Sequence, residues 1–308
     1  MIVGLGGVGG YFGGKLAAHY PPGNAEVEVS FIARGANESA IRAHGLRVEA
    51  DGATFTAHPA HLSSNPATLG VVDLVLVCTK GYDLEATIEQ LRPCLGPETA
   101  VLPLLNGVDS YERIRHLLPA QEVWEGCVYI VARLVAPGQV RDSGNVRSLF
   151  FGARTGPSAQ LARVEALLRA AGLDARLAPD IRRTVWEKFT FISPVATLTT
   201  AFDAPLGAVL AGAESRPLVA GLLAEVMQLA AALGIALSPD IAARTLARMA
   251  SLPYDTTSSM HSDYQAGKLT EVESLTGYVV RGSRALGLPC PTYEALYAQL
   301  LRRSQAAD

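Results

Sequence analysis

The stretch that decides the fold is "VGLGGVGGYFGG", residues 3–14. It places Gly4-x-Gly6-x-x-Gly9 between a very short apolar strand and a helical stretch over residues 8–20. In such a loop the first glycine permits a tight turn, the second lets backbone approach a pyrophosphate, and the third lets the helix pack on the strand. The start of the helix also offers unpaired N–H groups to phosphates. The loop therefore predicts a dinucleotide site made by Gly4, Leu5, Gly6, Gly7, Val8 and Gly9.

Short apolar runs alternate with helical stretches through the first half of the chain. Strands are expected at residues 27–34, 71–80 and 100–108, and a helix at residues 84–95. This alternation is typical of an α/β protein with a parallel, doubly wound sheet of the Rossmann type.

The pattern changes in the second half of the chain. Extended segments at residues 125–143 and 146–154 are expected to complete the sheet, and from about residue 180 helical stretches dominate. Asp180 is a suitable N-cap for the first of these helices. We expect a dinucleotide-binding Rossmann domain at residues 1–179, followed by an all-helical C-terminal domain for substrate and catalysis at residues 180–308.

Composition argues against several classes of protein. The 308 residues carry a formal charge of -3 and show no basic patch, so nucleic acid is not an expected partner. The longest apolar run, residues 217–237, contains Glu225 near its middle, and a carboxylate there costs a few kcal/mol in lipid. We expect a buried helix or one in a homodimer contact, and no membrane association.

Cysteine and histidine spacing points to neither disulfides nor metal. The histidines show no metal-binding spacing, so no metal is expected. No secretory signal is apparent, and we expect a cytoplasmic protein with reduced thiols. The cysteines are widely spaced without a CxxC pair: Cys78, Cys94, Cys127 and Cys290.

The end of the second strand bears on the choice of cofactor. An NAD enzyme usually places an acidic residue there to bind the ribose 2′-hydroxyl. Here Arg34 stands at that end, whereas Glu26 and Glu28 lie at the opposite end. An arginine offers a planar fork suited to a 2′-phosphate. NADPH is the expected cofactor, and the alternative is a solvated surface arginine.

Two polar residues end the next strands along the chain. Lys80 follows "LVLVCT" and Asn106 follows "VLPLL". Ligands of open α/β sheets lie outside the carboxyl ends of the strands, so both residues are expected at the cofactor crevice. The plainer alternatives are a solvated charge for Lys80 and a turn former for Asn106.

A third candidate lies in "RTVWEKFTFISPVA", residues 183–196, where Lys188 stands among aromatic and aliphatic residues. Lysine is rarely fully buried without a partner. Either its stem lies along apolar surface with the ammonium in water, or its charge is held in a cleft where it has a functional role.

At this point the chain resembles the ketopantoate reductases (2-dehydropantoate 2-reductases). The resemblance is carried, in order, by the glycine loop and by "ARG", "CTK", "LLNGV", "PGQV", "VWEKF" and "SSMHSDYQAGKLTEVESLTGYVV". It covers nearly the whole chain. It implies a Rossmann domain followed by a helical domain, and NADPH-dependent reduction of 2-dehydropantoate to pantoate on the route to pantothenate and coenzyme A.

The resemblance also implies roles for single residues. Lys188 corresponds to the catalytic lysine and Glu271 to its acidic partner, while Ser259 corresponds to a substrate-binding serine. Asn106 corresponds to the substrate-side asparagine, and it is also a candidate for contact with the cofactor, as Lys80 is. Hydride arriving at a ketone leaves negative charge on its oxygen, which a nearby cation stabilises and can protonate.

Glu271 has a purely structural alternative. In "TEVE", Thr270 and Glu273 have the spacing of a capping box, which puts Glu271 in the first helical turn, where a carboxylate is favourable anyway. We keep Glu271 as a functional residue and assign Glu273 to the cap.

The departures from the family concern the substrate. Members commonly carry asparagines four and eight residues after the catalytic lysine, where this chain has Ile192 and Ala196, and Leu206 replaces a third. Pro194 is also expected to interrupt the helix. Two alternatives to ketopantoate reduction therefore stay open: reduction of a less polar 2-oxo acid or ketone, and a cofactor-binding regulator without turnover.

Overall fold

The computed structural model describes residues 1–212 and 215–305. The chain divides into two compact units. The first comprises Met1–Leu105 and Ser110–Ile181, and the second Asn106–Asp109 together with the chain from Arg182 onward.

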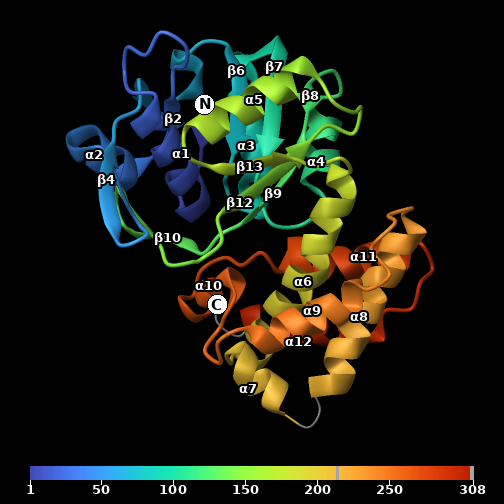
Figure 1. The fold of residues 1–308 in the computed structure, drawn as a ribbon. Helices are drawn as coiled ribbons and strands as arrows, with labels where there is room; N and C mark the ends of the chain where they lie inside the picture. The colour runs from blue at the N-terminus through green and yellow to red at the C-terminus, as the bar shows by residue number, and fades with distance from the viewer. Residues whose placement is uncertain (213–214, 306–308) are drawn as a thin grey trace. The chain divides into compact units, whose positions relative to one another are not determined.

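The first unit is built on a parallel sheet, as expected (Figure 1). Each neighbouring pair in it is parallel, and the strand that starts the chain lies in the middle. The strand order reverses between β1 and β6, which is where doubly wound sheets bind dinucleotides. In spatial order the strands are β5 (His61–Ser63), β2 (Ser30–Ile32), β1 (Ile2–Val3), β6 (Val72–Val77), β7 (Leu95–Pro103) and β8 (Glu122–Val123).

Helices connect these strands, and the helical stretches expected at residues 8–20 and 84–95 begin within one residue of helices in the structure. Ser158 caps α5 with its hydroxyl, and Gly172 follows the helix with a φ of +73°. A positive φ suits glycine because it has no Cβ. The helices of this unit are α1 (Gly7–His19), α2 (Gly35–His44), α3 (Leu84–Leu91), α4 (Ser110–Leu117) and α5 (Ala159–Ala170), with 3₁₀ turns η1 (Pro66–Thr68), η2 (Gly81–Asp83) and η3 (Arg92–Cys94).

The expectation that residues 125–143 and 146–154 complete the parallel sheet is wrong. They enter two separate sheets, because the chain turns back at Gly138 (φ +69°) and β11 pairs antiparallel with β10. One sheet has the order β10-β11-β3-β4 and the other β13-β12-β9. Their strands are β3 (Leu46–Ala50), β4 (Ala53–Ala57), β9 (Glu125–Tyr129), β10 (Ala132–Ala136), β11 (Gln139–Asp142), β12 (Ser148–Gly152) and β13 (Asp174–Leu177).

Helix α1 packs between the parallel sheet and the four-stranded sheet, and this close packing explains the glycines that follow the predicted loop. A Cβ on Gly10 would lie 2.4 Å from the side chain of Val140 in the four-stranded sheet. A Cβ on Gly13 would lie 3.2 Å from Ile2 in the parallel sheet. Adding a side chain would force the elements apart, since protein cores are close-packed.

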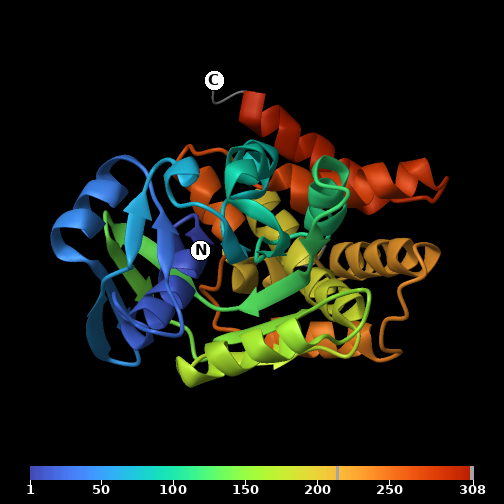
Figure 2. The ribbon, with the colours of Figure 1, turned by 90° about the horizontal axis from the view of Figure 1, so that it is seen from above.

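From Arg182 onward, the secondary-structure elements of the described residues are all helices, coloured from yellow to red in Figure 2. This agrees with the expected all-helical second half. Its elements are α6 (Ile181–Phe202), α7 (Leu206–Ala211), α8 (Ser215–Ala232), α9 (Ile241–Ser251), α10 (Ser259–Gln265), the π-helical turn η4 (Glu273–Gly277), α11 (Tyr278–Ala285) and α12 (Pro291–Gln305).

Pro194 does not interrupt the helix that carries Lys188, contrary to expectation. Helix α6 runs unbroken from Ile181 to Phe202 with the proline inside it. A proline lacks the N–H that would bond to the carbonyl four residues earlier. Contacts of Ser193 and Thr197 with other helices bind α6 on both sides of this position.

The long apolar run forms α8, and its carboxylate is satisfied inside the protein. Glu225 is 7% exposed and accepts hydrogen bonds from the backbone N–H groups of Thr292 (2.8 Å) and Tyr293 (2.9 Å). These groups open α12, where unpaired donors favour an anion. No helix among the described residues is long and apolar enough to cross a bilayer.

Candidate active site

The glycines of the loop fall into two classes: those closely surrounded by other atoms, and one with open space beside it. Gly4 has a φ of +90°, and a Cβ on it would lie 2.8 Å from the carbonyl of Cys78. A Cβ on Gly9 would lie 2.1 Å from the carbonyl oxygen of Gly4. A Cβ on Gly6 would meet nothing within 4 Å, although Gly6 stands at the N-cap of α1. The space beside Gly6 fits a ligand that approaches the backbone, as a pyrophosphate does.

The other loop residues support this arrangement through backbone and packing. Gly7 opens α1, and a Cβ on it would lie 2.0 Å from the carbonyl oxygen of Ala132 in β10. Leu5 is buried, and Val8 packs against the same core. These positions leave the N–H groups at the start of α1 as the polar elements of the loop.

Arg34 lies where an arginine can meet a ligand. It is exposed at the N-cap of α2, two residues beyond the carboxyl end of β2, and its guanidinium donates to the side-chain oxygen of Gln90. Glu26 and Glu28 precede β2 and are exposed.

Asn37 was missed by sequence reasoning. Its side-chain amide donates to the carbonyl of Leu5 (3.3 Å) and accepts from the N–H of Gly138 (2.7 Å), so it ties α2 to the glycine loop. An asparagine in a first helical turn carries no signal of such a contact in one sequence.

Lys80 stands at the N-cap of η2, three residues beyond β6, and is half-buried. Its neighbour Thr79 was also missed. The Thr79 hydroxyl oxygen is buried and has no hydrogen-bond partner among the described residues. Its backbone nitrogen lies 2.8 Å from the Cβ position of Gly4. Among the described residues this buried hydroxyl beside the glycine loop is without a partner, so it can bond to a polar ligand bound there.

Lys188 is 9% exposed, and its ammonium donates to the Oδ1 atom of Asn106 at 2.8 Å. An ammonium only donates, so the amide must present its oxygen to the lysine and keeps its Nδ2 hydrogens as a separate donor group. Next to Lys188 in the chain, Trp186 and Phe189 pack edge-on against each other and against Tyr278, with centroids 5.6–6.1 Å apart.

Glu271 is 4% exposed and lies just before the π-helical turn η4. Its carbonyl accepts from the N–H of Leu275 at 3.0 Å. The assignment of Glu273 to a capping box is wrong. Its carboxylate instead binds the guanidinium of Arg281 and accepts from the hydroxyl of Tyr297 at 2.6 Å.

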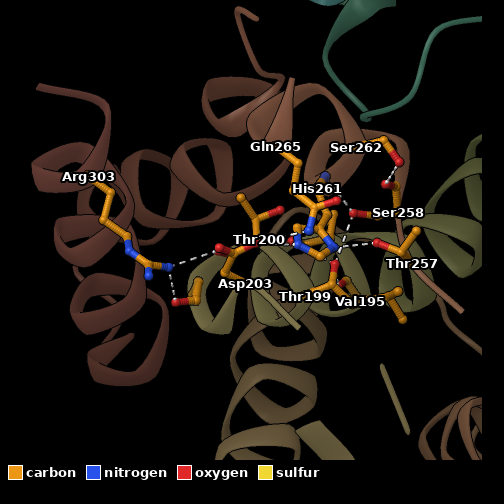
Figure 3. A network of polar contacts seen from close by, with 12 residues as sticks. Val195, Thr199, Thr200, Asp203, Thr257, Ser258, His261, Ser262, Gln265 and Arg303 are labelled. Carbon is orange, nitrogen blue, oxygen red and sulfur yellow. Dashed lines mark hydrogen bonds and ion pairs between the residues drawn. The ribbon is translucent and has the colours of Figure 1, made fainter. Parts of the chain in front are cut away.

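Ser259 is exposed as the first residue of α10, and a buried network anchors the residue before it (Figure 3). The hydroxyl of Ser258 accepts from the N–H of His261 and lies 3.0 Å from the hydroxyl of Thr199 on α6. His261 also bonds to Asp203 at 2.8 Å, just beyond the end of α6. The start of α10 is therefore fastened to the helix that carries Lys188.

The structure thus distributes the candidate residues between the two units. Asn106 and Lys188 are in direct contact in the second unit, which also contains Glu271 and Ser259. The glycine loop, Arg34 and Lys80 belong to the first unit.

Comparisons with known proteins agree with this organisation. The family described as ketopantoate reductase PanE/ApbA matches residues 1–156, and its C-terminal counterpart matches residues 180–304. The chain belongs to the ketopantoate reductase family. It is therefore an oxidoreductase of the nicotinamide-dependent kind that acts on CH–OH groups, which confirms the predicted fold class and reaction type.

Individual relatives resemble the chain over its whole length. An uncharacterized oxidoreductase, YkpB of Bacillus subtilis, is 29% identical over 97% of each chain. A 2-dehydropantoate 2-reductase of Halobacterium salinarum is 29% identical over 99% of this chain and 98% of its own. The solved 2-dehydropantoate 2-reductase of Porphyromonas gingivalis W83 is 39% identical, with a TM-score of 0.86 over 97% of this chain and 98% of its own.

Proposed function

We propose that the protein uses NADPH to reduce the 2-oxo group of 2-dehydropantoate, giving pantoate for pantothenate and coenzyme A synthesis. The observation that carries the proposal is the hydrogen bond from the buried Lys188 to Asn106. A cation in such a place is suited to a carbonyl oxygen that becomes negative during reduction.

The first 179 residues are proposed to bind the cofactor and residues 180–308 to supply the catalytic groups. When bound, the nicotinamide supplies hydride to the carbonyl carbon. The N–H groups at the start of α1 and the space beside Gly6 suit the pyrophosphate. Arg34 is the proposed partner of the 2′-phosphate, and Lys80 and Thr79 line the same edge of the sheet.

Lys188 is the proposed proton donor. Its ammonium gives one proton to the carbonyl oxygen as the carbon–hydrogen bond forms, so the ketone becomes an alcohol and the lysine is left neutral. Asn106 orients the ammonium and offers its Nδ2 hydrogens to a substrate oxygen. Ser259 is exposed and can bind the substrate through its hydroxyl.

Glu271 is the proposed acidic partner. Glu271 is 4% exposed, and a carboxylate at such a position can accept a hydrogen bond from the lysine ammonium or from a substrate hydroxyl. The proposal further assigns the enzyme to the cytoplasm as a homodimer, and light scattering after size-exclusion chromatography tests the homodimer.

A second candidate function is reduction of a less polar 2-oxo acid. Ile192 is half-buried, Ala196 and Leu206 are each 1% exposed, and all three replace asparagines common in the family. Side-chain amides can hydrogen-bond the polar groups of a substrate. With fewer of them, a site discriminates less strongly between a polar substrate and a less polar analogue.

A panel of 2-oxo acids separates these functions. The measurement is the specificity constant for NADPH oxidation with 2-dehydropantoate, pyruvate, 2-oxoisovalerate and phenylglyoxylate. We expect the highest value for 2-dehydropantoate. A higher value for another compound supports the second candidate, and tight NADPH binding without turnover on any compound indicates a regulator and rejects the proposal.

A further inference from the structure

Glu271 is followed by one π-helical turn, Glu273–Gly277, in a helix that then continues as α11. In a π-turn the backbone bonds run from residue i to i+5, and such turns are rare and concentrate at functional sites. They persist only where neighbouring groups stabilise them. The contacts around this turn show which groups do so.

Helix α6 provides two of these groups from one face. The hydroxyl of Ser193 donates to the carbonyl oxygen of Leu275 at 2.9 Å. One turn later, the hydroxyl of Thr197 lies 2.7 Å from that of Thr276. Ser193, Thr197 and Thr276 are fully buried, so these bonds are not exchanged with water.

A third group acts through Ser193. The phenol of Tyr293 lies 2.7 Å from the Ser193 hydroxyl. Because Ser193 gives its only hydrogen to the carbonyl of Leu275, Tyr293 must be the donor in this contact. Tyr293 is fully buried, and its position at the start of α12 is fixed by Glu225, which accepts from its backbone N–H at 2.9 Å. The π-turn is thus connected through buried hydrogen bonds to α6, α12 and α8.

The same helix that binds the π-turn also carries Lys188, five residues before Ser193. Helix α6 therefore sets the distance between the lysine and the segment that begins at Glu271. The turn after Asn106 joins this arrangement, since a Cβ on Gly107 would lie 3.4 Å from the carbonyl oxygen of Ser274.

We propose that Ser193 and Tyr293 are positioning residues, which fix the π-turn and so place Glu271 relative to Lys188. Neither touches the reacting atoms. The inference rests on the proposed function for the role of Glu271, but the way the turn is fixed is a property of the folded chain. A displacement of about 1 Å at a catalytic group can lower a rate about 100-fold.

The first test needs no substrate. Amide hydrogen exchange is measured for the segment 271–280 in Ser193→Ala and in Thr190→Val. Thr190 is a matched control, because among the described residues its buried hydroxyl bonds only to the Trp186 carbonyl of its own helix, at 2.9 Å. We expect exchange in this segment to accelerate about tenfold in Ser193→Ala, and by less than twofold in the control. Equal protection in both variants overturns the proposal.

The second test concerns catalysis. Ser193→Ala and Tyr293→Phe are made in the parent protein and in Glu271→Gln, and kcat is measured with the panel compound that is reduced fastest. We expect a loss of about tenfold for Ser193→Ala and about threefold for Tyr293→Phe, which keeps the bond to Leu275. In Glu271→Gln we expect no further loss, because the two changes act through one group. Ser193→Thr, which keeps the hydroxyl, should restore most of the rate.

The outcomes separate this inference from the proposed function. If Ser193→Ala lowers kcat by the same factor with and without Glu271, the serine acts only through general packing and the inference is wrong. If no 2-oxo acid is reduced, the proposed function fails while the exchange experiment still decides how the π-turn is fixed.

Discussion

At the scale of single residues, the chain shares its candidate catalytic and substrate-binding residues with its family. The lysine, the glutamate and the serine stand in the second unit, as the resemblance implies. Lys188 could be singled out from sequence because a charge in an aromatic run is unusual. Its contact with Asn106 could not, since 82 residues separate the two.

Arg34 provides a prediction at this scale. Because a guanidinium pairs with a 2′-phosphate that NADH lacks, Arg34→Ala should raise the Kd of NADPH at least tenfold and that of NADH less than twofold. Fluorescence titration of both nucleotides measures this. Gln90→Ala, which removes the neutral partner of Arg34, serves as control and should change both constants little. Equal weakening of the two nucleotides by Arg34→Ala rejects the 2′-phosphate assignment.

Asp203 provides a second prediction at the scale of single residues. Its hydrogen bond with His261 lowers the pKa of Asp203 below the ordinary value of 3.8, while burial opposes the shift. A carboxyl with a lowered pKa stabilises the fold fully above pH 3.8 and loses this contribution as pH falls through its folded-state pKa. Asp203→Asn should therefore cost stability near pH 6, and the difference from the parent should shrink below pH 3.8.

Urea unfolding of the two proteins across this range measures the effect. Asparagine is a suitable replacement because Asp203 has a φ of +49°, which asparagine also tolerates. A difference that stays constant from pH 6 to pH 2.5 contradicts the role given to the pair.

At the scale of secondary-structure elements, regular helices could be predicted from the sequence, whereas irregular backbone geometry could not. The helical stretch expected at residues 8–20 matches α1 within one residue at each end. The π-turn after Glu271 was not foreseeable, because it depends on hydroxyls from α6 and α12. Pro194 was misread for the same reason: tertiary contacts kept α6 continuous against local propensity.

The two classes of glycine in the loop are open to a direct comparison. Gly6→Ala adds a methyl where the chain leaves space, so it should weaken NADPH binding at least tenfold with a Tm within about 2 °C of the parent. Gly9→Ala places a methyl 2.1 Å from the carbonyl oxygen of Gly4 and should lower the Tm by several degrees. Thermal unfolding without nucleotide, followed by NADPH titration, distinguishes them. Equal destabilisation by both changes would show that Gly6 is needed for packing alone.

At the scale of the whole molecule, the fold class could be predicted and the secondary sheets could not. Strand β6 could be predicted as parallel from its apolar run, whose last three residues, Val75–Val77, are buried on both faces. Strand β11 buries only alternate residues, and its partner β3 lies about 90 positions away in the chain. Such a pairing leaves no local signal, so the segment was assigned to the wrong sheet.

The family was likewise readable from the order of its motifs, whereas the substrate was not. Ile192 and Ala196 change the chemistry of the helix face beyond Lys188 without altering the fold. The fold of a family does not by itself fix the substrate of a member. The panel of 2-oxo acids measures which substrate this chain reduces best.

The most direct test of the central claim is the single-turnover rate of NADPH oxidation in Lys188→Ala at saturating 2-oxo acid, with the Kd of NADPH measured in parallel. If the Lys188 ammonium protonates the carbonyl oxygen, the rate should fall at least about 100-fold, and the Kd of NADPH should stay within twofold of the parent. A rate equal to the parent's, or a defect confined to NADPH affinity, would contradict this role.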